Sequence, residues 1–190
     1  MSIDKECFQT QISIKDWFAD RKYKTKFMLD HPEYFSPDGL VVFCGGQGAG
    51  KTLSAVRYID RLCKKYPAAI LVSNIYLNIP SYKGDVLPYE GITEVAKLDN
   101  GYKGIICFID EIQAEFNSLE SAKIHPSVIQ TISQQRKRRL HVVGTTQLFK
   151  RLAKPWREQC NVCVDCSFIL GCIHSYLNFH LNPRQYCRSQ

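Results

Sequence analysis

The stretch that decides the fold of this chain is Gly45-Gly46-Gln47-Gly48-Ala49-Gly50-Lys51-Thr52. Its spacing, G-x-x-x-x-G-K-S/T, is that of a phosphate-binding loop, whose glycines let successive backbone N–H groups point inward at the start of a helix. An apolar run, 40–44, precedes the loop, and a helical pattern, 51–65, follows it. This strand–loop–helix context favours phosphate binding over a glycine-rich turn that only caps a helix.

The loop residues and the following Leu53 are therefore expected to bind ATP together with Mg²⁺. Lys51 would reach the β- and γ-phosphates, and the hydroxyl of Thr52 would coordinate the metal ion. This predicts the cofactor site from residues 45 to 53.

A second apolar strand, 105–109, ends in two adjacent carboxylates, Asp110 and Glu111. The carboxyl ends of parallel strands face the ligand crevice of such sheets. Asp110 is then placed to hold Mg²⁺ opposite Thr52, and Glu111 is the candidate general base that activates the attacking water. The alternative is that the acidic pair merely caps a helix.

A fourth strand, 140–144, is followed by Thr145, Thr146 and Gln147. In the ATPase branch with a catalytic glutamate, this strand lies between the phosphate loop and the Asp110 strand. Gln147 could therefore hydrogen-bond the γ-phosphate or the lytic water. In the alternative interpretation, Thr145 or Thr146 caps a helix and Gln147 only follows it.

The fold class predicted is α/β, with a mostly parallel sheet of about five strands and helices on both faces. Nearly continuous apolar runs indicate strands that are covered on both sides. The runs are 40–44, 69–73, 105–109, 140–144 and 162–170, with helical patterns at 51–65 and about 120–138. The domains expected are an N-terminal helical appendage (1–38), an ATPase domain (39–180) and a short tail (181–190).

The composition is that of an ordinary globular protein of 190 residues, with 25 Lys and Arg against 18 Asp and Glu. Nine cysteines without a secretory signal indicate free thiols in a reducing cytosol. Cys160, Cys163 and Cys166 lie close in sequence, but strand geometry points the last two to opposite faces, so buried thiols are favoured over a zinc site. No apolar stretch reaches transmembrane length.

The interval 134–157 carries eight Lys or Arg and no acidic residue. Three interpretations remain open: an arginine finger that reaches a neighbouring subunit's nucleotide, a contact with the DNA backbone, and a solvated helix end. Arg138 and Arg139 are the finger candidates, with Arg151 and Arg157 as alternates.

Several motifs together resemble the FtsK–HerA superfamily of DNA-pumping ATPases, and within it the zonula occludens toxin-like (Zot) ATPases of filamentous phages. They are 45–52, Ser73-Asn74-Ile75, Phe108-Ile109-Asp110-Glu111-Ile112-Gln113, Ser133-Gln134-Gln135-Arg136 and Val143-Gly144-Thr145-Thr146-Gln147. The resemblance implies a RecA-like core, a homo-oligomeric ring, and ATP hydrolysis coupled to packaging or extrusion of phage DNA. Zot-like proteins also carry a membrane span after the ATPase domain, and none is present in this sequence.

The location implied is the host cytoplasm, at the inner membrane face if an anchor follows residue 190, or the virion. Portal, capsid or membrane export proteins are the further partners expected. A competing hypothesis is a nucleotide-gated assembly protein of a phage export complex with little DNA contact, which Trp17 and Phe18 in the appendage favour. A small-molecule kinase is disfavoured, because no lid-like segment with paired arginines follows Asp110.

Overall fold

The computed structural model describes residues 13–37, 39–119, 126–169 and 172–178. The chain divides into two compact units, Met1–Tyr34 and Phe35–Gln190. Each unit is described by itself.

The N-terminal unit is built on one long helix, α1 (Ile14–Asp30). The Ser13 side chain caps its first turn by accepting from the Lys15 N–H, and the N–H of His31 closes the last turn on the Phe27 carbonyl. Phe27 packs edge-on against Tyr34. The helix expected in the N-terminal appendage is present, and none of its residues is buried.

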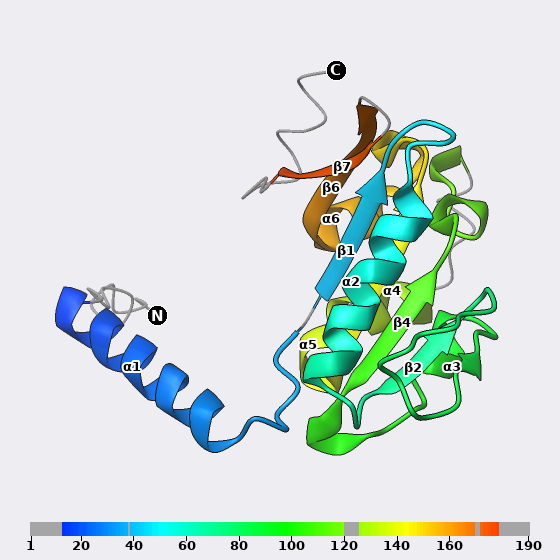
Figure 1. The fold of residues 1–190 in the computed structure, drawn as a ribbon. Helices are drawn as coiled ribbons and strands as arrows, with labels where there is room; N and C mark the ends of the chain where they lie inside the picture. The colour runs from blue at the N-terminus through cyan, green and yellow to red at the C-terminus, as the bar shows by residue number, and fades with distance from the viewer. Residues whose placement is uncertain (1–12, 38, 120–125, 170–171, 179–190) are drawn as a thin grey trace, which may run out of the picture. The chain divides into compact units, whose positions relative to one another are not determined.

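The second unit is a seven-stranded sheet in the order β3-β2-β4-β5-β1-β6-β7 (Figure 1). All neighbours pair in parallel except β7, which runs antiparallel to β6. The strands are β1 (Gly39–Cys44), β2 (Ile70–Ser73), β3 (Leu87–Pro88), β4 (Ile105–Ile109), β5 (Leu140–Thr146), β6 (Cys160–Ile169) and β7 (Cys172–Asn178).

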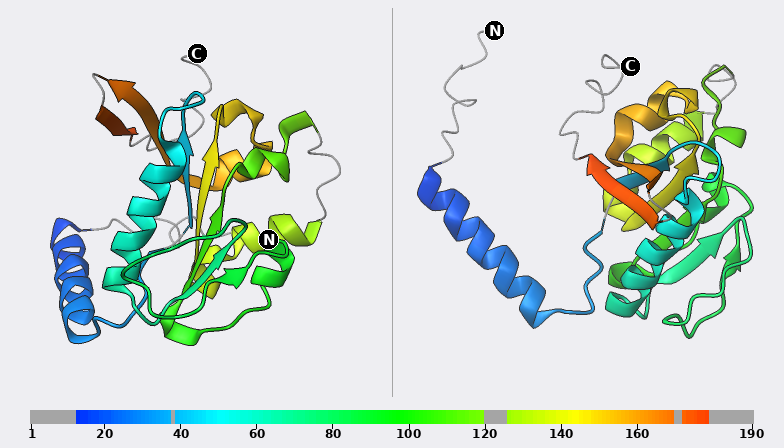
Figure 2. Two further views of the ribbon diagram at one scale, coloured as in Figure 1. Left: turned by 45° about the vertical axis from the view of Figure 1, so that its right-hand side comes forward. Right: turned by 45° about the horizontal axis from the view of Figure 1, so that its top comes forward.

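Helices cover both faces of this sheet, as the two views of Figure 2 show. One face packs under α2 (Lys51–Lys65), through Ala55, Ile59 and Leu62. The other face packs against α3 (Ile92–Val95), α4 (Pro126–Ser133) and α6 (Lys154–Gln159). Short helices complete the fold: α5 (Gln135–Arg138) and the 3-10 helices η2 (Gly101–Lys103), η3 (Ile112–Ala114) and η5 (Phe149–Arg151).

The predicted α/β class with a mostly parallel sheet is confirmed, whereas the strand count is higher than expected. Two strands were not predicted. β3 is a two-residue strand within the irregular excursion after β2, and β7 arises where the apolar run after Cys160 folds back on itself. The helical pattern at 120–138 is divided into α4 and α5, and its first residues lie outside the described ranges.

The cysteines that the structure describes with side chains are free thiols, and all six are buried. Cys163 belongs to the core on one face of the sheet and Cys166 to the core on the other, as the strand period requires. Within the described ranges, no three His, Cys, Asp or Glu side chains gather in a way that could hold a metal ion. In that same part of the chain, no helix combines the length and apolar character needed to cross a bilayer.

Candidate functional site

The loop between β1 and α2 has the backbone shape of an anion cradle. Gly48 and Gly50 both have left-handed φ angles, +77° and +78°, and Gly50 is the N-cap of α2. Lys51 reaches back over the loop, where its Nζ donates to the Gly46 carbonyl oxygen at 2.9 Å. N–H groups, a helix N-terminus and an ammonium group therefore meet at one place, which is the arrangement that binds a phosphate.

Gly45 lets the loop leave β1 close to the neighbouring strand. A Cβ at this position would lie 2.5 Å from the carbonyl oxygen of Cys166 in β6, and its φ of +151° is one that other residues rarely adopt. At Gly46 a Cβ would meet no heavy atom within 4 Å. There is thus no room for a side chain at Gly45, where the loop begins, whereas the space around Gly46 is open.

The polar group that faces the helix start is Asp110, directly after β4. Its Oδ1 accepts from the hydroxyl of Thr52 at 3.0 Å. The two residues are 58 positions apart in the chain, and parallel strands bring them to the same sheet edge. The structure thus brings together the two predicted Mg²⁺ ligands.

Thr145 joins this pair from β5, the strand between β4 and β1. Its hydroxyl donates to the same Asp110 Oδ1 at 2.7 Å and accepts from the backbone N–H of Glu111 at 2.8 Å. The Thr145 side chain is completely buried. β5 runs through Thr146, so neither threonine caps a helix, contrary to the alternative considered for this stretch.

Glu111 has a left-handed backbone, with φ 52° and ψ 50°. It stands at the N-cap position of η3, yet its side chain makes no capping bond, so the structure does not support a purely capping role for the acidic pair. A residue other than glycine in this region costs about 1–3 kcal/mol and persists only where its surroundings hold it. The carboxylate of Glu111 is exposed at the edge of the cradle.

Asn74, at the end of β2, holds Asp110 from the other side. Its Oδ1 accepts from the Asp110 N–H at 2.8 Å, and its Nδ2 donates to the Asp110 carbonyl at 2.9 Å. The side chain of Asn74 therefore fixes the backbone position from which the carboxylate projects.

Gln147 follows Thr146, which pairs with Cys44, the residue before the phosphate loop. This register places Gln147 beside the start of the loop, in the predicted position between the loop and the Asp110 strand. Its Oε1 accepts from Arg151 Nη1 at 3.3 Å. Arg151, one of the alternate fingers, is thus tied to the chain's own Gln147.

The remaining arginine candidates lie elsewhere in the fold. Arg138 donates to the backbone oxygen of Ala96, and Arg139 has a φ of 50° directly before β5 begins. Both precede the amino end of β5, whereas the phosphate loop follows the carboxyl end of its parallel neighbour β1. Both therefore lie at the edge of the sheet opposite the chain's own phosphate loop. Arg157 lies half-buried in α6.

The segment that follows β4 and the segment that follows β5 are hydrogen-bonded to each other. The N–H of Ala153 donates to the carbonyl of Phe116 at 2.8 Å, and Asn117 forms an isolated bridge with Leu152. Phe116 stacks on the buried ring of Trp156, with centroids 4.1 Å apart. The turn after Glu111 and the turn after Gln147 therefore pack on one support, formed by Phe116, Ala153 and Trp156.

Two buried thiols lie next to the start of the phosphate loop. The Sγ atoms of Cys44 and Cys163 are 3.2 Å apart. The hydrogen bond with Cys163, together with burial, raises the pKa of Cys44 above the usual range of a thiol. Cys44, the residue directly before the loop, therefore carries a protonated, uncharged thiol that does not repel a phosphate.

Magnesium suits the residues at this edge, because a hydroxyl and a carboxylate are the hard oxygen donors that this cation prefers. The Thr52–Asp110 hydrogen bond shows that both oxygens lie within reach of one point. Thr52 and Asp110 would hold the ion, which would neutralise charge on the phosphate oxygens.

Solved structures with a similar fold share this architecture. The N-terminal domain of the zonular occludens toxin from Neisseria meningitidis matches with a TM-score of 0.57 at 16% identity, over 81% of this chain and 91% of that one. The genome packaging NTPase B204 of Sulfolobus turreted icosahedral virus 2, in complex with ATP-gammaS, gives 0.55 at 18%, over 71% and 77%. This is a RecA-like P-loop NTPase fold.

A third match is a flagellar protein. The flagellar accessory protein FlaH of Methanocaldococcus jannaschii has a TM-score of 0.51 at 11% identity, over 78% of this chain and 83% of that one. No protein-family model and no curated protein sequence matches the chain significantly. Identities this low establish the fold alone.

Two residues of the site, Asn74 and Thr145, had no predicted role in binding or catalysis. Both are polar side chains at the carboxyl ends of strands that flank β4. Their position at the ends of these strands could have identified them as site residues, because polar groups at this edge of a parallel sheet point to the ligand crevice.

Proposed function

We propose that the chain is an ATP-hydrolysing motor of phage type that moves DNA during virion assembly. The observation that carries the proposal is the hydrogen bond between Thr52 and Asp110. It unites the phosphate cradle and the acidic strand end in one site, with Glu111 as the next residue.

Each residue of the site has a chemical role in this proposal. The loop amides and Lys51 bind the triphosphate, and Glu111 takes a proton from water as its oxygen bonds to the γ-phosphorus. The bond from that phosphorus to the bridging oxygen breaks, and ADP and phosphate leave. Gln147 contacts the γ-phosphate or the attacking water from the neighbouring strand end.

The viral assignment is supported by the similar structures, one of which is described as a genome packaging NTPase. That protein's complexes with AMPPCP and ATP-gammaS support a nucleotide ligand for the same fold. The Zot domain has the same fold, and the resemblance of the sequence motifs to Zot-like ATPases favours a place among phage assembly ATPases. By the same analogy the chain works in the host cytoplasm or at its membrane face, with portal, capsid or export proteins as partners.

DNA is the proposed substrate because the basic segment 134–157 has no compensating acidic residue. Arg138 and Arg139 precede β5 at the edge opposite the chain's own phosphate loop. In a ring of identical subunits, this edge would supply the arginine that contacts the neighbour's γ-phosphate.

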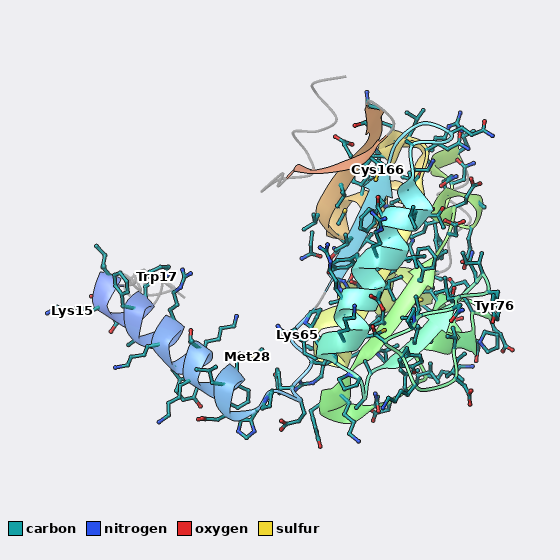
Figure 3. All side chains as sticks on the ribbon, viewed as in Figure 1. Lys15, Trp17, Met28, Lys65, Tyr76 and Cys166 are labelled. Atoms are coloured by element: carbon teal, nitrogen blue, oxygen red, sulfur yellow. The ribbon has the colours of Figure 1, made fainter. Side chains whose placement is uncertain are left out.

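A second candidate function is a nucleotide-gated assembly protein, in which ATP orders an interface with protein partners. The observation in its favour is α1, whose Trp17 and Phe18 are 48% and 61% exposed. Figure 3 shows Lys15 and Trp17 projecting from the helix. Exposed aromatic side chains on a helix are typical of protein interfaces.

Steady-state ATP hydrolysis with and without double-stranded DNA tests the proposal. We expect DNA-stimulated turnover that is lost in Lys51→Ala, and DNA binding that weakens steeply as salt rises. Lys150→Ala, outside the cradle, is the matched control and should keep its DNA-free turnover. ATP hydrolysis that persists in Lys51→Ala would refute the assigned site. ATP hydrolysis that DNA does not stimulate, together with no measurable DNA binding, would favour the assembly protein.

A further inference from the structure

Thr145 contacts both acidic residues of the site through a single hydroxyl group. Its O–H donates to Asp110 Oδ1 at 2.7 Å, and its oxygen accepts from the Glu111 N–H at 2.8 Å. One side chain on β5 is therefore bonded to the predicted metal ligand and to the backbone of the predicted general base, 35 and 34 residues away in the chain.

The hydrogen bond from the Glu111 N–H to Thr145 stabilises an unusual backbone conformation at Glu111. Glu111 occupies the left-handed region at φ 52°, where a β-carbon is disfavoured. Such a conformation needs a partner that selects it over the ordinary ones. The Glu111 N–H has that partner in Thr145, so this hydroxyl fixes the direction in which the base leaves the strand.

The hydrogen bond from Thr145 to Asp110 is the second one that the same carboxylate oxygen accepts. Oδ1 accepts from Thr145 on β5 and from Thr52 on α2. Two donors from different elements on one oxygen restrict the rotation of the carboxylate about its side-chain bonds. The partners of a metal-ligating carboxylate tune its affinity and reactivity in this way.

We propose that Thr145 is a positioning residue that sets the orientation of Glu111 for water activation and of Asp110 for Mg²⁺. The inference rests on the proposed ATP hydrolysis. Thr145 lies outside the phosphate loop and is fully buried, so it acts through the two acidic residues and without contact to the nucleotide.

The chain supplies a matched control one residue along the strand. Thr146 is also completely buried, but its hydroxyl bonds to the Leu148 carbonyl and to neither acidic residue. Threonine and valine have nearly the same shape, so Thr145→Val and Thr146→Val each remove one buried hydroxyl with little change in volume. Thr145→Ser keeps the hydroxyl and loses the methyl group.

The test compares kcat and KM for ATP in the wild type and these three variants, with thermal unfolding as a check on folding. We expect Thr145→Val to lower kcat by about 10- to 100-fold with little change in KM. Loss of a residue that hydrogen-bonds to a metal-ligating side chain typically has an effect of this size. Thr145→Ser should restore most of the kcat, and Thr146→Val should keep it. Equal kcat in Thr145→Val and Thr146→Val, or no recovery in Thr145→Ser, would overturn the proposal.

A binding measurement separates this inference from the proposed function. The affinity of the folded wild type and variants for a fluorescent, non-hydrolysable ATP analogue is titrated with Mg²⁺. Thr145→Val should need a higher Mg²⁺ concentration for half-maximal binding, and Thr146→Val should not. A wild type that binds the analogue without hydrolysing ATP would defeat the proposed function, and the Mg²⁺ shift would still decide the role of Thr145. An unchanged Mg²⁺ requirement, or no binding at all, would overturn the inference.

Discussion

Asn74 extends the ladder of hydrogen bonds one step beyond β2 with its side chain. The primary amide presents an acceptor and a donor to the Asp110 peptide, as a neighbouring strand residue would do. The backbone N–H of Asn74 also donates to the Phe108 carbonyl. One residue thus anchors the strand end that carries Asp110.

Asn74→Ala removes both side-chain bonds to Asp110. Because the bonds are exposed to water, we expect a loss of about 1 kcal/mol in the free energy of unfolding, together with weaker catalysis. Urea unfolding and kcat measure the two effects. Asn78→Ala, an exposed asparagine later in the same segment, is the control and should change neither. Unchanged stability and kcat in Asn74→Ala would contradict the anchoring role.

At the scale of elements, the phosphate loop depends on β6 as well as on β1 and α2. Gly45 lies against the β6 backbone at Cys166, where a side chain has no room. The position of the loop is therefore set by a strand more than a hundred residues later in the chain.

Gly45→Ala should displace the loop, because its Cβ would come too close to the Cys166 carbonyl and its φ would be strained. We expect a lower melting temperature and weaker nucleotide binding. Gly46→Ala, which meets no neighbour, should keep the wild-type melting temperature. Differential scanning fluorimetry with and without nucleotide compares the two variants, and equal melting temperatures would count against this account.

The elements differ in how far the sequence predicts them. β1, β4 and α2 follow from continuous apolar runs and a helical period, since burial on both faces leaves a strong local signal. β3 has only two residues and owes its existence to pairing with β2, which no local pattern encodes. The bonds of Thr145 and Asn74 escape prediction for the same reason, because their partners lie on other strands. The phosphate loop, Asp110 and Glu111 were predicted from motifs, but the left-handed backbone of Glu111 was not.

At the scale of the whole molecule, the two units differ in how they are stabilised. The buried hydrophobic core of the described residues begins at Phe35 and lies entirely in the second unit. α1 buries no residue and exposes Ile14 and Leu29 by about three-quarters of their surface. Isolated helices of this length are marginally stable in water, and the buried core of the second unit contains no residue of α1.

A chain that starts at residue 35 should therefore unfold at the same temperature as the full-length protein. A chain that starts at residue 39 lacks Phe35, whose ring packs on Tyr66 and over Gly104. We expect it to lose about 3 kcal/mol of stability, as truncation of a buried Phe does. Thermal unfolding followed by circular dichroism distinguishes the two, and a lower melting temperature for the chain from residue 35 would show that α1 stabilises the fold.

The packed support formed by Phe116, Ala153 and Trp156 has a mechanical consequence for the site. Glu111 and Gln147 follow different strands, yet the loops that contain them pack against the same residues. Because both loops pack on α6, a displacement of α6 would be transmitted to Glu111 and Gln147 together. A substitution or a bound neighbour that moves Trp156 would therefore disturb both strand ends at once, and not one of them alone.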